Sequence, residues 1–485
     1  MGLIRAGETC WRQARATRLA LLNDCEDYFA ALRQALRAAR RSIHLLGWGF
    51  DPRIKLTQDD PTADAVGREL AALAAANPAL DVRLLVWRSA LPISATQGFF
   101  PHRAKGWFKG TGVRFELDAA TPLGASQHQK VVVIDDALAF VGGADLMADR
   151  WDTTQHLDHD SRRTDFPGHR HGCRHEVMAM VEGPVAAALG ELFRARWGAA
   201  IGEAAPDPGP SEVSPWPDGW AADLADVDVA IARTQPAWRG APAVREIAEL
   251  TLESIFAARS LIYLENQYFT WPLAVEALAA RLAEPQGPEV VLICSHQSPS
   301  YFDRITMDRA RANALWRLKT SDVFGRFHAL APFTAGGAPI VAHSKVMIVD
   351  DALLRVSSAN LNNRSHGFDS ECGVAVEAST PAERAAIAGM RDRLAAHWVG
   401  RGADDLAAAR TGRASYAGAL FAMDEGAHRL RSIPRTRLGP VGEFIADFHI
   451  GDPVEAADSW RPWRRRADLI AEARALRMER LTSPR

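Results

Sequence analysis

Two different spacings of hydrophobic residues follow one another along the chain. Residues 12–40 carry large apolar side chains at helical intervals, which predicts a single helix. Short runs of branched apolar residues at 43–46 and 82–86 predict buried strands, and the alanine-rich segment 63–76 between them predicts a helix. Strand, helix and strand in this order are typical of a βαβ unit, so we expect an α/β fold.

The same order of elements recurs in the second half. Here the pattern predicts a helix at 243–257, a strand at 261–264, a helix at 273–283 and a strand at 290–293. Recurrence over so long a period indicates a duplicated half-domain. We therefore predict two pseudo-symmetric halves, each a mixed β-sheet flanked by helices, with the active site at their interface.

A proline-rich stretch separates the two predicted halves. Its prolines, which are unsuited to regular structure, are Pro206, Pro208, Pro210, Pro215 and Pro217. We place the halves at 1–200 and 226–400, the linker at 201–225 and a C-terminal extension at 401–485.

One chemical motif occurs once in each half. The pattern H-x-K-x4-D is formed by His128, Lys130 and Asp135, and again by His343, Lys345 and Asp350. The two copies lie 215 positions apart, and each runs from a polar loop into an apolar strand. Related segments follow both, Gly143-Ala144-Asp145 and Ser358-Ala359-Asn360. A doubled motif with doubled companions indicates that each half supplies part of one site.

The spacing within the motif suits phosphate chemistry. Alternate side chains on a strand share a face, so the histidine and lysine of each copy point the same way. A neutral imidazole can attack phosphorus, and an ammonium beside it stabilises the charge that develops on the phosphate oxygens. With two such pairs, one histidine can attack while the other protonates the leaving oxygen. Because the lysines supply the positive charge, we expect no metal or other cofactor.

Carboxylates are needed to orient the histidines, and two lie in matching positions. Glu371 and Glu176 each begin a similar apolar segment, 28 and 48 positions after the motif histidine of the same half. We expect each to hold its own histidine. Asp135 and Asp350 open Asp-Asp turns at strand ends, so we assign them to structural support.

The whole-chain composition narrows the functional classes. The 485 residues are 47% apolar with a net charge of −2, which argues against a dedicated nucleic-acid binder. No apolar run reaches transmembrane length, and the N-terminal residues lack a hydrophobic export core. Five scattered cysteines without a C-x-x-C pair favour reduced thiols. We expect a cytoplasmic, monomeric protein that associates peripherally with membranes when it acts.

Several segments together resemble the phospholipase D superfamily, in particular its eukaryote-like branch. These segments are 42–51 (SIHLLGWGFD), 139–146 (AFVGGADL) with 150–152 (RWD), 263–269 (YLENQYF), and 357–365 (SSANLNNRS) with 369–371 (DSE). With the two H-x-K-x4-D motifs, the resemblance covers most of residues 10–400. One departure is Ser357, which stands where that family usually has glycine.

The resemblance implies roles for individual residues. His128 would form a phosphohistidine intermediate, and His343 would act as the general acid and then as the base that activates the acceptor. Lys130, Lys345 and Asn360 would bind the phosphate. Asp145 takes the place of Asn360 in the first half, and we exclude it from the phosphate ligands because it is an acid.

Aromatic and basic residues follow the second strand of each half. They are Phe99, Phe100, His102, Arg103, Lys105, Trp107, Phe108 and Lys109 in the first half, and Tyr301, Phe302, Arg304, Met307, Arg309 and Arg311 in the second. Such mixtures suit a phospholipid headgroup surface, although ordinary loop packing would use the same residues. Residues 460–466 (WRPWRRR) are a further candidate for membrane contact.

An apparent insertion at 152–173 invites a metal interpretation. Its candidate ligands are His156, Asp158, His159, Asp160, His169, His171, Cys173 and, just beyond, His175. Their spacings match no familiar zinc pattern, so we predict no metal site. Arg162, Arg163, Arg170 and Arg174 instead predict a loop that attracts anions to the mouth of the site.

We therefore expect a phospholipase D-type phosphodiesterase that releases phosphatidate and a headgroup alcohol, with transfer to other alcohols as a second activity. Three alternatives stay open: a cardiolipin synthase-like phosphatidyltransferase, a nuclease or other phosphodiesterase, and a non-catalytic phosphate- or lipid-binding protein.

Overall fold

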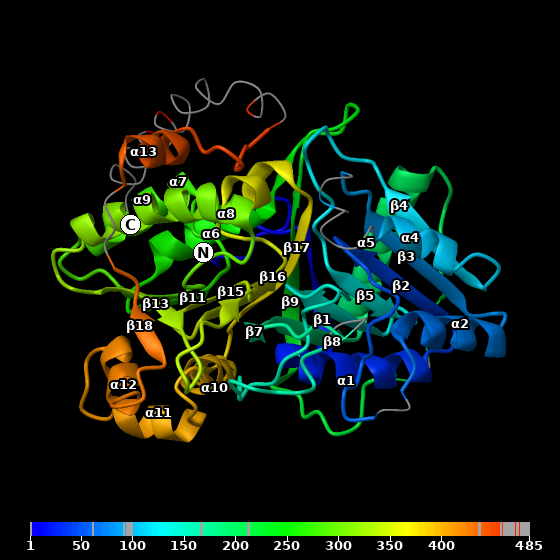
Figure 1. Ribbon diagram of the computed structural model, residues 1–485, viewed down its shortest axis with the longest axis horizontal. Helices are drawn as coiled ribbons and strands as arrows, with labels where there is room; N and C mark the ends of the chain where they lie inside the picture. Colours follow the sequence, from blue (N-terminus) through cyan, green and yellow to red (C-terminus); the bar gives the residue numbers. More distant parts are fainter. Residues whose placement is uncertain are drawn as a thin grey trace.

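One continuous β-sheet runs through both halves of the chain in the computed structural model (Figure 1). The structure describes residues 2–60, 63–90, 93, 100–164, 168–209, 211, 214–434, 438–455, 458, 471 and 475. The 16-stranded sheet has the order β18-β13-β12-β11-β15-β16-β17-β9-β1-β8-β6-β5-β2-β3-β4, with β10 added beside β9. The predicted α/β fold is confirmed, and the sheets of the two halves are joined rather than separate.

The elements of the first half follow the chain from β1 to α5. They are β1 (Arg12–Asn23), α1 (Asp24–Ala38), β2 (Ser42–Gly47), α2 (Val66–Ala76), β3 (Asp81–Trp87), α4 (His102–Trp107), β4 (Val113–Asp118), β5 (Val131–Ile134), β6 (Leu138–Gly142), β7 (Arg174–His175), β8 (Val177–Glu182) and α5 (Pro184–Ile201).

The second half repeats this order and ends in an extension. Its elements are β9 (Leu224–Gln235), β10 (Val244–Arg245), α6 (Glu246–Ala257), β11 (Leu261–Glu265), α7 (Pro272–Leu282), β12 (Glu289–Ile293), α8 (Tyr301–Ile305), α9 (Met307–Ser321), β13 (Phe327–Pro332), β14 (Val341–Ala342), β15 (Val346–Val349), β16 (Leu353–Ser357), the π-helix η1 (Arg364–Phe368), β17 (Glu371–Glu377) and α10 (Pro381–His397). The extension holds α11 (Ala403–Arg410), α12 (Tyr416–Met423), β18 (Leu430–Ser432) and α13 (Pro440–Asp447).

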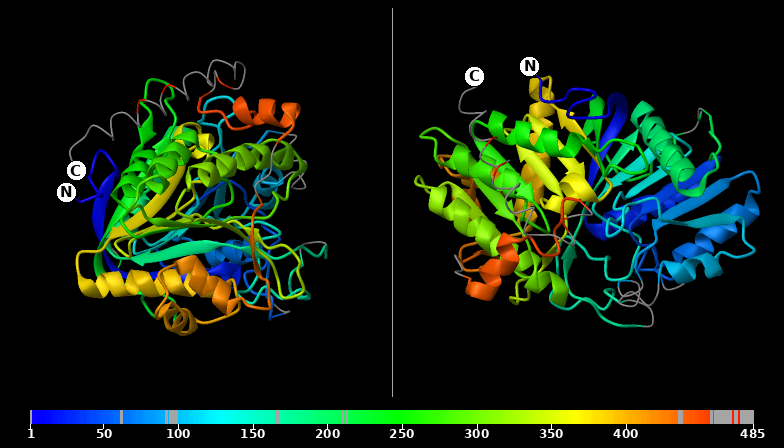
Figure 2. Two further views of the ribbon diagram at one scale, coloured as in Figure 1. Left: turned by 90° about the vertical axis from the view of Figure 1, so that its left-hand side faces the viewer. Right: turned by 90° about the horizontal axis from the view of Figure 1, so that it is seen from above.

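The sheet is pseudo-symmetric about its two central strands. From the centre outward, β1-β8-β6-β5-β2-β3-β4 in the first half matches β9-β17-β16-β15-β11-β12-β13 in the second. β1 and β9 pair antiparallel, with Arg12 opposite Ile231 and Leu19 opposite Leu224. The halves consequently lie side by side, the first in blue to cyan and the second in green to yellow (Figure 2).

The first predicted helix was wrong over half its length. Residues 12–23 form β1, and only 24–38 form a helix. The strand end is buried on both faces: Leu19 and Leu21 pack in one core cluster, whereas Leu22 packs in another together with α1. A strand covered on both sides loses the alternation of apolar and polar residues, so its apolar residues merged with the helical pattern that follows.

Helices cover both faces of the sheet in each half. In the first half, α1 and α2 pack on one face and α5 on the other. In the second half, α6, α7 and α9 cover one face, and α10, α11 and α12 the other. Among the described residues, no helix is long and apolar enough to cross a membrane.

Asp135 and Asp350 end the motif strands with the same contact. The Asp135 carboxylate accepts hydrogen bonds from the backbone N–H groups of residues 40, 41 and 42, at 2.7–2.8 Å. The Asp350 carboxylate accepts from the backbone N–H groups of residues 259, 260 and 261. Both aspartates have left-handed backbones, with φ of 55° and 52°. Each therefore fixes the end of a motif strand to the start of its neighbour.

Candidate active site

The motif histidines of both halves face one open cavity of about 1600 Å³ between the halves. His128, His343 and Asn360 line it together with Asp145 and Arg174. The cavity lies where the loops before β5 and β15 meet. The structure thus brings the two sequence motifs together.

Each motif loop pairs with the chain of the other half. In front of His343, β14 pairs in parallel with β7, and the His343 N–H donates to the His175 carbonyl at 2.8 Å. In front of His128, Gln127 bridges to Ser370, and the His128 N–H donates to the Ser370 carbonyl at 2.9 Å. Both pairings place a motif histidine beside the opposite half's glutamate, Glu371 at the start of β17 or Glu176 just before β8.

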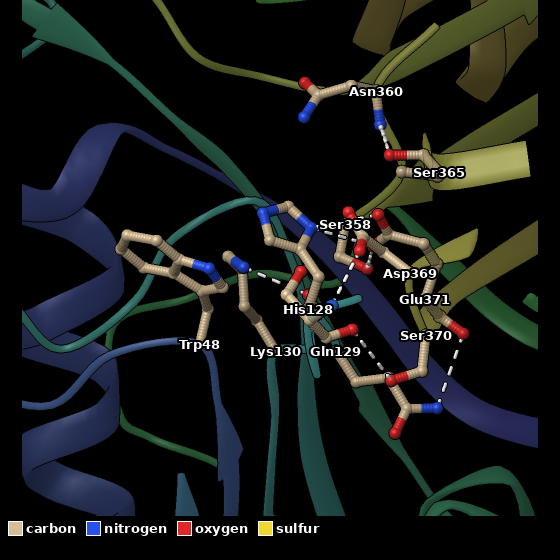
Figure 3. Close-up of polar contacts among 12 residues, drawn as sticks. Trp48, His128, Gln129, Lys130, Ser358, Asn360, Ser365, Asp369, Ser370 and Glu371 are labelled. Atoms are coloured by element: carbon tan, nitrogen blue, oxygen red, sulfur yellow. Dashed lines mark hydrogen bonds and ion pairs between the residues drawn. The ribbon is translucent and has the colours of Figure 1, made fainter. Parts of the chain in front are cut away.

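The carboxylates are crossed between the halves, so our expectation that each serves its own histidine was wrong. His128 Nδ1 lies 2.9 Å from Glu371 Oε2 (Figure 3), and His343 Nδ1 lies 2.8 Å from Glu176 Oε2. The reason is the pairing of each motif loop with the other half, which matching positions along the chain do not reveal. With Nδ1 held by a carboxylate, each histidine has Nε2 left for chemistry.

The two lysines are buried and fixed alike. The ammonium of Lys130 donates to the carbonyl of His128 at 3.0 Å (Figure 3), and that of Lys345 donates to the carbonyl of His343. Lys130 is 2% exposed and Lys345 is 1% exposed. Two buried lysines, each fixed beside its motif histidine, can supply positive charge to a bound anion.

Asp145 pairs with Lys130 and holds the backbone at the end of β2. Its Oδ2 lies 3.2 Å from Lys130 Nζ, and its Oδ1 accepts from the backbone N–H groups of Trp48 and Gly49. Nearby, the halves approach closely at Gly143, where a Cβ would lie 3.1 Å from the His343 carbonyl oxygen and 3.2 Å from Lys345 Cδ. Gly143 therefore permits the close contact that brings the lysines together.

Asn360 presents an uncommitted amide to the cavity. Its backbone N–H donates to Ser365 Oγ at 3.0 Å, while its buried Oδ1 makes no hydrogen bond (Figure 3). Below it, Asp369 accepts from the Ser126 N–H and from the Arg364 guanidinium. The second-half loop is thereby tied to the first half, with the Asn360 amide facing the histidines.

The second histidine sits in the more cationic surroundings. Burial lowers the pKa of His343 well below its usual value, and Lys345 and Arg174 lower it further. Burial also lowers the pKa of Lys345 well below its usual range, with Lys130 adding to the effect. For Glu371, burial alone would raise the pKa, but His128 and Lys130 outweigh it and the pKa is lowered. The positive charges that lower these pKa values would also stabilise a bound anion.

Two arginines of the predicted anion-attracting loop form ion pairs with aspartates of the same loop. Arg162 pairs with Asp160, and buried Arg163 pairs with Asp152 at 3.1 Å. Only Arg174 of the four predicted arginines lines the cavity. Arg150 joins it there, a residue that the sequence reading did not select.

The aromatic loops border the cavity in part. Phe100, His102, Phe302 and Met307 line it, whereas Phe108 is buried against Phe50 and Phe115. Arg304 and Arg311 donate to backbone carbonyls of residues 295, 296, 298 and 299 instead of facing the cavity. Phe99 and the segment 460–466 lie outside the described residues.

Three supporting groups were given no role in the site by the sequence, although Trp48 and Ser358 lie in the segments quoted above. Trp48 stands edge-on to His128 with ring centroids 6.4 Å apart (Figure 3). Ser358 donates from its hydroxyl to Glu371. Asp452, in the extension, accepts from the backbone N–H groups of Asn363 and Arg364, so the extension reaches the site. Trp48 follows a predicted strand and could have been found; Asp452 carries no local signal.

Comparisons with known proteins show which families the chain resembles. A family model described as "Phospholipase D" matches residues 35–211, and one described as "Cardiolipin synthase, PLD-like domain" matches residues 251–398. Phosphatidylserine synthase of Haemophilus influenzae Rd KW20 has a similar fold, with a TM-score of 0.54 at 14% identity over 78% of this chain and 86% of that one.

Relatives share sequence over most of this chain. Phospholipase D A of Dictyostelium discoideum is 25% identical over 70% of this chain and 31% of its own length, and phospholipase D alpha 4 of Arabidopsis thaliana is 24% identical over 68% and 58%. Cardiolipin synthase A of Cronobacter sakazakii is 22% identical over 75% and 66%. The chain thus spans about a third to somewhat over half of the first two relatives. It belongs to the phospholipase D superfamily of phosphodiesterases and phosphatidyltransferases.

Proposed function

We propose that the protein cleaves the distal phosphodiester bond of glycerophospholipids, giving phosphatidate and a headgroup alcohol. The observation that carries this proposal is the crossed pair: two histidines, each held at Nδ1 by a buried glutamate, face one cavity with two buried lysines. Such a site can attack phosphorus from one side and protonate the leaving oxygen on the other.

The reaction would proceed in two steps. His128 Nε2 attacks phosphorus and forms the P–N bond as the P–O bond to the headgroup breaks, and His343 Nε2 gives its proton to the leaving oxygen. His343 then takes a proton from water, whose oxygen attacks phosphorus and releases His128. Glu371 and Glu176 stabilise the imidazolium forms, while Lys130, Lys345 and the Asn360 amide hold the phosphate oxygens.

The rim of the cavity supports a lipid as the substrate. Leu123 is 75% exposed and Phe302 60% exposed, and both line the cavity. Tyr301, next to Phe302 on α8, is 77% exposed. Apolar side chains at the mouth of a cationic site suit acyl chains above a phosphate. We propose that the protein acts at a phospholipid surface and needs no cofactor for the chemical step; its cytoplasmic location and monomeric state stay predictions.

A phosphatidyltransferase reaction is the second candidate. The match of the second half to the cardiolipin synthase domain favours it, since a covalent intermediate can be captured by an alcohol as well as by water. In that case the alcohol of one phosphatidylglycerol would capture the phosphatidyl group of another.

Lipid product analysis tests both candidates. Purified protein is incubated with vesicles of phosphatidylcholine, phosphatidylethanolamine and phosphatidylglycerol plus ethanol, and the lipids are analysed by mass spectrometry. We expect phosphatidate and phosphatidylethanol, both absent with His128→Ala and retained with His159→Ala, which changes an exposed histidine outside the cavity. Cardiolipin as the main product would establish the transferase, and no lipid product would reject the lipid substrate.

A further inference from the structure

A second cluster of histidines lies buried between the halves, apart from the two motif histidines. It consists of Asp24 at the start of α1, His156 in the insertion, His175 in β7 and His397 at the end of α10. One ligand atom from each lies within 4.8 Å of all the others. The insertion at 152–173 thus contributes one member, His156, and His175 follows just beyond it; Asp24 and His397 lie far away in the sequence.

Two of these histidines have the same ring nitrogen, Nδ1, engaged in a hydrogen bond. His156 Nδ1 faces Asp152 Oδ2 at 2.9 Å, and His397 Nδ1 faces the Leu394 carbonyl oxygen. Both partners are acceptors, so each Nδ1 carries a proton, and in the neutral form of either ring Nε2 holds a lone pair. Both Nε2 atoms are buried, and neither makes a hydrogen bond within the part of the chain that the structure describes.

Asp24 adds a third unpartnered acceptor. Its Oδ1 accepts from His175 Nδ1 at 2.9 Å and from the Glu176 N–H at 3.1 Å, while its buried Oδ2 accepts no hydrogen bond from any described residue. Asp24 Oδ2 lies 3.7 Å from His156 Nε2. Two ligands of one tetrahedral Zn²⁺, each about 2.0–2.1 Å from the ion, lie about 3.4 Å apart.

The chemistry of the three atoms calls for a cation. His156 Nε2, His397 Nε2 and Asp24 Oδ2 are all acceptors, whereas a buried water can donate only two hydrogen bonds. We propose that His156, His397 and Asp24 bind one divalent transition-metal ion, with Zn²⁺ expected from the two imidazoles and one carboxylate.

The hydrogen bonds around the three ligands match those of metal sites. Ligating histidines usually donate their other N–H to a carboxylate or carbonyl, as His156 and His397 do. His175 lies between Asp24 and Glu265, at 2.9 and 3.1 Å, so both its nitrogens are committed and it positions the Asp24 carboxylate.

The metal would join the two halves rather than take part in the chemistry. Asp24 and His156 belong to the first half, and His397 to the second. Asp24 also holds both backbone groups of Glu176, the residue that orients His343. A bound ion would therefore stabilise the interface beside the active site, and this role does not depend on the substrate proposed above.

Metal content and a cobalt spectrum test the site directly. The full-length protein, produced with added Zn²⁺ and freed of loose metal by gel filtration, should carry one metal ion per chain by mass spectrometry. Replacement by Co²⁺ should give visible absorption bands of low-coordinate cobalt, and removal of the metal should lower the Tm. A metal-free wild-type protein that takes up neither ion at 10 µM would overturn the proposal, whatever the variants do.

Variants locate the ion. His156→Gln and His397→Gln should each weaken Co²⁺ binding by about 10- to 100-fold or more, whereas His159→Gln, an exposed histidine three residues from His156, should keep the wild-type spectrum. Loss of binding in His159→Gln, or an unchanged spectrum in both cluster variants, would place the metal elsewhere and refute this site. If a cluster variant does not fold, the wild-type stoichiometry and spectrum still decide.

Discussion

The two halves carry the same motif, yet the surroundings of their histidines differ. The His128 side chain is 16% exposed and stands beside Trp48, whereas His343 is 7% exposed and lies among Lys345, Arg174 and Arg150. On the His343 side, Arg174 of β7 donates from Nε to Glu176 Oε1 at 3.1 Å, and the same Glu176 carboxylate holds His343 Nδ1. A nearly symmetric pair of motifs thus has chemically unequal surroundings.

Removing either histidine should have the largest effect. His128→Ala and His343→Ala should each lower turnover of natural phospholipids by about 10⁴-fold or more, since histidines acting as a unit are not replaced by solvent. A p-nitrophenyl phosphodiester should distinguish the roles of the two histidines, because its leaving group needs no proton. His343→Ala should still form the phosphoenzyme, detected by rapid acid quench and peptide mapping, whereas His128→Ala should not. A phosphoenzyme at His343 in the His128 variant would reverse the assignment.

Substitution of the crossed glutamates should have the second-largest effect on the reaction rate. Glu371→Gln should slow phosphoenzyme formation with every leaving group, by about 10²- to 10⁴-fold, because it orients the attacking His128. Glu176→Gln should matter for natural headgroups and much less for p-nitrophenol, because it serves His343. Single-turnover rates measure both. The opposite dependence on leaving group would indicate that each glutamate serves the histidine of its own half.

The positive charges around His343 should determine the pH at which kcat/KM falls on the alkaline side of its pH profile. As the general acid of the first step, His343 must be protonated, so kcat/KM should fall as pH rises through its lowered pKa. Arg174→Gln removes a nearby positive charge, which raises the pKa of His343 and moves the limb to higher pH by about one unit. A limb that stays in place, or moves to lower pH, would contradict this assignment of charge.

The strand-end aspartates should affect stability rather than chemistry. Asp135→Ala leaves three backbone N–H groups without their carboxylate, and because Asp135 is 1% exposed we expect a loss of about 2–4 kcal/mol in the free energy of unfolding. Asp350 is less buried, so Asp350→Ala should lower the free energy of unfolding by less, about 1–2 kcal/mol. Denaturant titrations give both values. The kcat of the folded fraction should stay within about twofold; a larger fall would mean that these residues act in the site.

The sequence was sufficient for the parts of the site that depend on nearby residues. We could predict that His128 and Lys130 share a face, and that a strand follows each motif, because alternation along a strand is a local property. The contact of Glu371 with His128 could not be predicted, because it depends on a pairing between residues 243 positions apart. β1 was misread because burial on both faces removes its alternation. Asp452 could not be found at all, because its contacts come from folding of the extension onto the site.

The crossing has a consequence for how this protein can have arisen. Because each half orients the other's histidine, a single half folded alone would have a nucleophile without its carboxylate. A one-copy ancestor would therefore have had to work as a homodimer, with two copies exchanging glutamates across a twofold axis. Two copies within one chain can diverge independently, and the two motif histidines here differ in exposure, 16% for His128 against 7% for His343. Separately expressed halves should accordingly regain activity only when mixed.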